Sequence, residues 1–170
     1  MNERIASCMQ QAISYLGEHP DEARYTDSPA TATREGSLSF KVETPTGGSI
    51  VTDMPSGVGG DGSAPSPGWV MRAALAACDA TLIAMRAAQE GVELEKLEVT
   101  VDSTSDDRGL LGMDDSIPAG PLRTRIRVGL SSPGTTEEQL RELVDWAHHH
   151  SPVGDAVSRE IPLDIEVTAL

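Results

Sequence analysis

The chain has 170 residues, with 13 Lys or Arg against 27 Asp or Glu, so its formal net charge is −14. Such a charge disfavours contact with nucleic acid phosphates and anionic lipid, and we expect neither nucleic acid nor membrane as a partner. No apolar run is long enough to span a bilayer, and the N-terminus lacks the apolar segment of a signal peptide, so we expect a cytoplasmic protein. Two cysteines are too few for a disulfide framework or a zinc site, and no cofactor is expected.

The first predicted element is a helix over residues 2–16, where apolar residues recur at a helical period and Gly17 ends the pattern. Residues 19–30 are polar and rich in turn formers. Residues 1–30 are therefore predicted to form a helical extension with a linker, ahead of a domain over residues 31–170. Cys8 lies on this helix, and we expect it to pack in a core, as free cysteines usually do. The alternative is that Cys8 serves Cys78 as a resolving thiol.

A hairpin is predicted next, because residues 37–43 alternate apolar with polar side chains, residues 46–48 suit a turn and residues 49–54 suit a return strand. The segment 55–67 has no periodicity and several glycines, which is typical of a loop. It lacks the Lys-Ser/Thr pair of a phosphate-binding loop and the spacing of a dinucleotide fingerprint. Nucleotide binding is therefore a weak interpretation.

A long helix is predicted over residues 68–89, which are rich in Ala and contain neither Pro nor a second Gly. Small alanines on its other faces would let neighbouring backbone approach closely, so we expect a central, buried helix. Its predicted apolar stripe consists of Met71, Leu75, Cys78, Leu82 and Met85.

The remaining elements follow from alternation and capping signals. Residues 94–103 and 122–131 alternate and predict long antiparallel strands with one wet face, joined by a loop over residues 106–121. An amphipathic helix begins near Thr135 with a capping signature, and Ser151 with Pro152 begins a short second helix. Residues 162–170 are predicted as the last strand. This order indicates an α+β fold with helices packed on one face of an antiparallel sheet.

From pattern alone, Cys78 is a small buried hydrophobe, because its neighbours on the stripe are Met and Leu. A reactive thiol there would need a cation or a donor from another segment. Ser151 is explained structurally as a helix cap, since the sequence shows no base or oxyanion hole for a serine nucleophile.

His148, His149 and His150 are consecutive, so on a helix they point about 100° apart and cannot all face one metal ion. A solvated helix end is the better interpretation, with histidines complementing the C-terminal dipole, although one of the three could reach a site at Ser151. The paired acids of the 106–115 loop lack the spacing of a calcium loop and are expected to be solvated. No metal site is predicted.

One stretch resembles the signature of the OsmC/Ohr family: GGDGSAPSPGWVMRAALAACDATLIAMRAAQEGVELEKLEVTVD. The matching features are the turn Ser66-Pro67, the run Ala76-Ala77-Cys78 and the helix end at Gly91. The downstream block 147–153 is similar to the second motif of the family, whose usual form is Cys-Pro-Val where this chain has Ser-Pro-Val. The resemblance covers roughly residues 37–170.

The resemblance implies an OsmC-like α+β fold, with antiparallel sheets around long central helices, and an intertwined homodimer. It also implies a cytoplasmic thiol peroxidase of the oxidative-stress response that reduces organic hydroperoxides. The peroxidatic thiol would be Cys78, the resolving position would be Ser151, and the activating arginine would be Arg34. The carboxylate that orients this arginine in the family would fall at Gly68.

Three hypotheses remain, of which the third is an enzyme activity unrelated to the family. In the first, the chain is a one-cysteine hydroperoxide reductase that an external thiol reductant recycles, because Ser151 supplies no second sulfur. In the second, it is a member without peroxidase activity that binds a small apolar ligand or senses oxidants through Cys78. The acidity of the Cys78 thiol would separate the first two.

Overall fold

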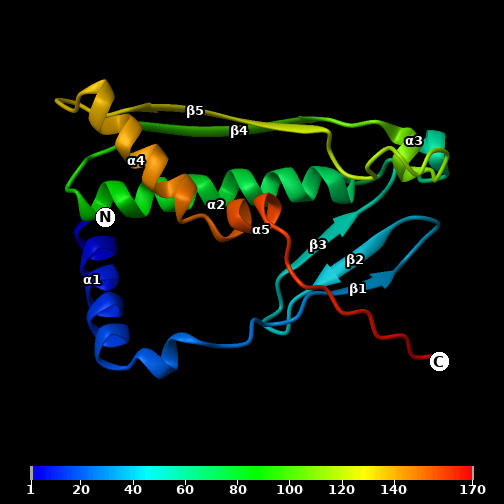
Figure 1. Ribbon diagram of the computed structural model, residues 1–170, viewed down its shortest axis with the longest axis horizontal. Coiled ribbons are helices and arrows are strands. Elements are labelled where there is room, and N and C mark those ends of the chain that lie inside the picture. Colours follow the sequence, from blue (N-terminus) through cyan, green and yellow to red (C-terminus); the bar gives the residue numbers. More distant parts are fainter. Residues whose placement is uncertain (1, 170) are drawn as a thin grey trace. The chain divides into compact units, whose positions relative to one another are not determined.

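The computed structural model describes residues 2–169, which divide into two compact units. One unit comprises residues 4–74, and the other comprises residues 75–169 with residues 2 and 3. The elements in chain order (Figure 1) are α1 (Asn2–Glu18), the 3-10 helix η1 (Pro20–Ala23), β1 (Thr31–Arg34), β2 (Phe40–Glu43), β3 (Ser49–Thr52), the 3-10 helix η2 (Ser56–Val58), α2 (Pro67–Gln89), β4 (Lys96–Thr104), α3 (Asp107–Leu110), β5 (Arg123–Ser131), α4 (Glu137–His149) and α5 (Pro152–Ser158).

A three-stranded antiparallel sheet in the order β1-β2-β3 forms the first unit's framework. The register pairs Arg34 with Phe40 and Phe40 with Thr52, so the predicted hairpin is confirmed with shorter strands. Strand β1 was not predicted. Its four residues are all exposed and show no apolar alternation, so the pattern that marks a half-buried strand is absent there.

Helix α2 begins where Ser66 accepts a hydrogen bond from the Trp69 amide (3.3 Å), and it ends before Gly91, whose φ is +68°. The predicted bounds are thus confirmed to within one residue. Its burial differs from the expectation, because in the single chain only Leu75 of the predicted stripe is buried, while the stripe's other members are half-buried. The fully buried residues of the helix are Leu75, Asp79, Ile83, Ala87 and Ala88.

Among the described residues, α2 is the one helix long and apolar enough to cross a membrane, with a mean hydropathy of 1.3 over its best window. This is weak evidence for a membrane span, because the core helix of a soluble protein has the same length and composition. Its five buried residues include a carboxylate, Asp79, whose Oδ2 lies 3.6 Å from the imidazole of His148 on α4.

The second unit combines a long β ribbon with two helices. Strands β4 and β5 pair antiparallel over nine residues each, from Lys96 opposite Ser131 to Thr104 opposite Arg123, which confirms both predicted strands. Helix α3 is a single turn inside the segment predicted as a loop. Helix α4 begins with the predicted capping signature, in which the Thr136 side chain and the Gln139 side chain each bind the other residue's backbone amide.

The core of this unit lies between α2 and α4. Its buried apolar residues are Leu75, Ile83, Ala87, Ala88, Leu143 and Ala147. The α4 side chain of Trp146 lies under the Arg86 guanidinium of α2, 5.0 Å from ring centroid to carbon, which adds a cation–π contact to this packing. The last turn of α4 is thereby held against the second half of α2.

Two expectations are wrong. Residues 162–169 form no strand, although residue 170 lies outside the described part, and their apolar side chains Leu163, Ile165 and Val167 are 83%, 81% and 90% exposed. The alternation is real, but no strand among residues 2–169 pairs with it. Cys8 is exposed rather than packed in a core, because α1 contains no buried residue.

Candidate functional site

The structure brings Cys78 and Ser151 together. The Ser151 hydroxyl donates a hydrogen bond to the Cys78 sulfur at 3.2 Å, and Ser151 is 0% exposed whereas Cys78 is half-buried. The two residues lie on α2 and at the start of α5, 73 positions apart in sequence. The Ser151 hydroxyl is thus a hydrogen-bond donor held at the sulfur by the start of α5.

Local structure explains why the Ser151 side chain is so well placed. Ser151 caps α5, with its hydroxyl oxygen accepting from the Gly154 amide at 3.1 Å, and Pro152 occupies the first helical turn. The hydroxyl hydrogen therefore remains for the sulfur of Cys78. A side chain at Gly154 would place its Cβ 3.0 Å from the Ser151 Cβ, closer than ordinary contact, so Ser151 would have to shift slightly to accept one.

A buried carboxylate lies next to the thiol in sequence. Asp79 is 3% exposed, and its Oδ2 lies 3.6 Å from Nδ1 of His148 at the end of α4. Its other oxygen, Oδ1, is buried and has no hydrogen-bond partner among the described residues. Sequence reasoning missed Asp79, although its place between Leu75 and Ile83 at four-residue spacing is a signal, because a charged residue on an apolar helix face requires a partner.

The three consecutive histidines have three different neighbours. All are exposed, as expected for a solvated helix end, but only His148 reaches a buried acid. The Nδ1 atom of His149 is 2.6 Å from the Asp145 carbonyl, and that of His150 is 2.7 Å from the Trp146 carbonyl. Among residues 2–169 no three His, Cys, Asp or Glu side chains come together as metal ligands.

Arg34 belongs to the first unit, on β1, and is exposed. Its Nε donates to the carbonyls of Gly36 at 2.7 Å and Ser37 at 3.2 Å. The guanidinium thus has local partners in the turn that follows its own strand.

In the same unit, one carboxylate organises the loop that precedes α2. Asp53 is buried, and its oxygens accept from the amides of Met54, Asp61 and Ser63 and from the Ser63 hydroxyl, at 2.8 to 3.2 Å. The amide and hydroxyl of Ser63 are the main reason why the pKa of Asp53 lies below its ordinary value. Gly60 lies so close that a Cβ there would be 1.9 Å from the Met54 carbonyl oxygen.

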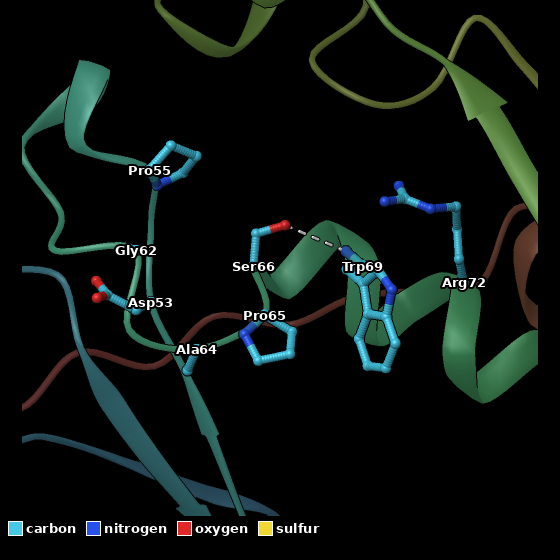
Figure 2. Close-up of a pocket in the computed structure, with 8 residues that line it drawn as sticks. All are labelled: Asp53, Pro55, Gly62, Ala64, Pro65, Ser66, Trp69 and Arg72. Atoms are coloured by element: carbon cyan, nitrogen blue, oxygen red, sulfur yellow. Dashed lines mark hydrogen bonds between the residues drawn. The ribbon is translucent and has the colours of Figure 1, made fainter.

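This loop and the first turns of α2 border a hollow of about 460 Å³ (Figure 2). Trp69 and Arg72 project from the helix on one side, while the loop closes the other. The residues that line it are Asp53, Pro55, Gly62, Ala64, Pro65, Ser66, Trp69 and Arg72. Neither Trp69 nor Arg72 was recognised from the sequence as part of a site.

Comparison with known proteins gives one family and many structures. The family model described as OsmC-like protein matches residues 60–166. No curated protein matches the chain in sequence.

The chain is similar to an organic hydroperoxide resistance protein OsmC from Legionella pneumophila, with 23% identity, a TM-score of 0.58 and coverage of 79% of this chain and 91% of the other. It is similar to an OsmC-like protein of unknown function from Vibrio cholerae, with 16% identity, a TM-score of 0.66 and coverage of 80% and 96%. It is also similar to an OsmC-like protein from Mycoplasma pneumoniae, with 17% identity, a TM-score of 0.66 and coverage of 79% of this chain and 89% of the other. At these identities the likeness shows the fold, and the α+β OsmC-like fold expected from the sequence is confirmed.

Proposed function

Since the chain belongs to the OsmC-like protein family, we propose that it is a cytoplasmic one-cysteine peroxidase of the oxidative-stress response, which reduces organic hydroperoxides through Cys78. The observation that carries this proposal is the hydrogen bond from the fully buried Ser151 hydroxyl to the Cys78 sulfur. It gives the thiolate a fixed donor, and half-burial leaves the sulfur open to a small substrate.

The chemistry balances with one cysteine and an external thiol. The Cys78 thiolate attacks the outer oxygen of the hydroperoxide, the O–O bond breaks, and the alkoxide leaves as an alcohol after taking up a proton. Cys78 becomes a sulfenic acid. A thiol from solution then displaces water to form a mixed disulfide, and a second thiol releases the reduced Cys78 with a disulfide of the two reductant molecules.

Ser151 would act as a hydrogen-bond donor in this scheme and not as a resolving group. A hydroxyl has no sulfur with which to close a disulfide, and residues 75–169 contain no cysteine other than Cys78. The exposed Cys8 on α1 remains an alternative resolving thiol. Arg34 stays the proposed activating arginine, since its two carbonyl partners engage only Nε and the guanidinium has further N–H donors with which to serve a thiolate.

A homodimer is part of the proposal. The exposed alternating side chains of Leu163, Ile165 and Val167 form the pattern of an unpaired strand, which a second copy could complete. Helix α2 gives a second reason, because most of its apolar residues are only half-buried in the single chain. The division into an extension, residues 1–30, and an OsmC-like domain, residues 31–170, is proposed with it.

The second candidate is a non-peroxidase member that binds a small apolar ligand or senses oxidants through Cys78. It is favoured by the hydroxyl at position 151, where the family motif usually has a thiol. Both candidates are separated by mass spectrometry after treatment with one equivalent of cumene hydroperoxide and then excess thiol. Stoichiometric alcohol with a sulfenic acid trapped at Cys78, followed by catalytic turnover, supports the peroxidase.

The matched controls are Cys78→Ser and Cys8→Ser. The first should abolish hydroperoxide reduction and the second should leave it unchanged. A disulfide between Cys8 and Cys78 would assign the resolving role to α1 instead. No consumption of hydroperoxide by the wild-type protein would contradict the enzymatic proposal.

A further inference from the structure

The hollow beside the first turns of α2 has the size and composition of a small-molecule site. Its volume of about 460 Å³ lies within the roughly 300–1,000 Å³ typical of such sites, and all eight lining residues belong to one unit. Figure 2 shows the Trp69 ring and the Arg72 side chain on the helix side of this space, to the right of Pro65 and Ser66. The wall thus combines a flat aromatic surface with a cation.

These two side chains are unusual in this chain. It has only 2 Trp among its 170 residues and carries a net charge of −14, yet Trp69 leaves 51% of its surface exposed beside an arginine. An exposed indole is suited to stack on another flat ring. A guanidinium has five N–H donors in a planar fork, which lets it keep a partner in the protein and still bind a carboxylate.

Gly68 lies next to the Arg72 side chain on the same helix and has no side chain of its own. A Cβ built at Gly68 would lie 3.9 Å from Nη1 of Arg72, and no other atom would be within 4 Å. Residue 68 is one helical turn before residue 72, so an acidic side chain at this position would reach the guanidinium as an ordinary i, i+4 pair. With glycine there, residue 68 itself supplies no acidic partner, and the planar fork of the guanidinium has further N–H donors for an anion from outside the chain.

The opposite wall is preformed. The Asp53 carboxylate is saturated by donors from Met54, Asp61 and Ser63, so its charge is directed into its own loop. Gly60 packs so closely against that carboxylate and the Met54 carbonyl that the loop has no room for a side chain at this position. A preformed wall lowers the entropy that a ligand must lose to bind.

We propose that this hollow binds a small aromatic carboxylate, whose ring stacks on Trp69 and whose carboxylate takes, beside Gly68, the position on Arg72 that an acidic side chain would fill. This site goes beyond the thiol chemistry proposed for Cys78, because none of its residues belongs to the unit that holds Cys78 and Ser151. It assigns the hollow to anionic rather than neutral aromatic ligands.

Isothermal titration with 2-naphthoate, together with the NMR signal of the Trp69 indole N–H, tests the assignment on the full chain. We expect saturable binding, a shift of the Trp69 signal, and affinity at least about tenfold weaker for neutral 2-naphthalenemethanol, since a charge-assisted hydrogen bond is lost. Cyclohexanecarboxylate should also bind more weakly, because it cannot stack. The Trp69→Phe protein identifies the indole signal.

Gly68→Glu is the decisive variant, with Gly68→Ala as its control. The introduced carboxylate should pair with Arg72 and weaken 2-naphthoate binding by about tenfold or more, while the Ala variant, whose Cβ meets Nη1 only at contact distance, should bind as the wild type does. The Arg72→Gln protein should also lose 2-naphthoate binding. If the Arg72→Gln protein does not fold, the Gly68→Glu protein still tests the proposal. Absence of saturable 2-naphthoate binding, or equal affinity in the Gly68→Glu protein, overturns the proposal.

Measuring the alkylation rate of Cys78 in the same variants keeps the two proposals apart. The Arg72→Gln protein should leave that rate unchanged, so loss of naphthoate binding with a normal thiol concerns the hollow alone.

Discussion

Asp79 and His148 form a pair that joins α2 to the end of α4, with 3.6 Å between Oδ2 of the buried acid and Nδ1 of the exposed imidazole. Both residues are close to the candidate site in the chain. Asp79 follows Cys78 directly, and the His148 carbonyl accepts a hydrogen bond from the Ser151 amide at 3.4 Å. The pair therefore helps to fix the turn from which Ser151 reaches the sulfur.

Replacing the imidazole tests this pair. In a His148→Gln protein the Asp79 carboxylate would keep its burial and lose its partner, so we expect the free energy of unfolding to fall by about 1–2 kcal/mol, toward the low end because the imidazole is 51% exposed. Urea titration measures the change. His149→Gln is the matched control and should have almost no effect; equal losses in both proteins would mean that the contact with Asp79 contributes nothing.

The Ser151 hydroxyl should affect the reactivity of Cys78. A Ser151→Ala protein loses the donor to the sulfur, so alkylation of Cys78 by iodoacetamide at neutral pH should become about 2- to 10-fold slower, the worth of one hydrogen bond. Ser158→Ala removes a hydroxyl from the same helix that bonds only to the Gly154 carbonyl, and its rate should be normal. An unchanged alkylation rate in the Ser151→Ala protein would mean that the hydrogen bond from Ser151 does not affect the reactivity of Cys78, and the proposed function would lose its main support.

Replacing each of two glycines in the loop before α2 by alanine should change the free energy of unfolding by very different amounts. At Gly60 a methyl group would overlap the Met54 carbonyl, so Gly60→Ala should lower the free energy of unfolding by about 1–3 kcal/mol or more. At Gly57 nothing lies within 4 Å of the added Cβ, and Gly57→Ala should stay within about 0.5 kcal/mol of wild type. Thermal unfolding of the two proteins compares them directly.

Asp53 makes a defined contribution to the acid sensitivity of the protein. Because its folded-state pKa is lowered, chiefly by the Ser63 amide and hydroxyl, its stabilising effect is complete above the unfolded pKa of about 3.9 and is lost as the pH falls through the lower folded value. In Asp53→Asn this contribution is absent at every pH. The stability difference between wild type and variant should therefore be largest near neutral pH and shrink below about pH 4; a difference that does not change with pH would contradict this account.

The dimer can be tested on the C-terminal segment. Charging one member of its exposed apolar row, as in Val167→Asp, should convert a dimer to monomers, which light scattering after size exclusion would detect. Thr168→Asp places the same charge on the other face of an extended segment and should leave the dimer intact. A wild-type protein that is monomeric at micromolar concentration would rule out the proposed assembly.

Sequence alone predicted the regular elements whose own residues carry the signal. Helix α2 was recognisable from its alanines and its closing Gly91, and the β4–β5 ribbon from strict alternation. Strand β1 gave no such signal, because Thr31–Arg34 forms a strand only through its hydrogen bonds with β2. The strand predicted over residues 162–170 shows the opposite case, an alternating pattern that pairs with no strand in the described part of the chain.

The candidate site was less accessible from sequence. Spacing could not bring Cys78 and Ser151 together, because 73 residues separate them, and only the resemblance to a family suggested that they would meet. The close approach of Gly154 to Ser151 and the contact of Asp79 with His148 depend on three-dimensional packing. The sequence shows Trp69 and Arg72 as individual residues, but it does not show that they and the Asp53 loop border a common hollow.

The hydroxyl at position 151 also decides how long an oxidised Cys78 would persist. Where a second sulfur is at hand, the protein itself ends the oxidised state at a rate independent of its surroundings. Here, with no other cysteine in residues 75–169, the lifetime would depend on how much thiol is dissolved around it. A second oxidant molecule competes with that thiol and leads to irreversible sulfinic acid. The fraction of the protein in which Cys78 escapes irreversible oxidation would thus depend on the ratio of oxidant to thiol rather than on the amount of oxidant alone.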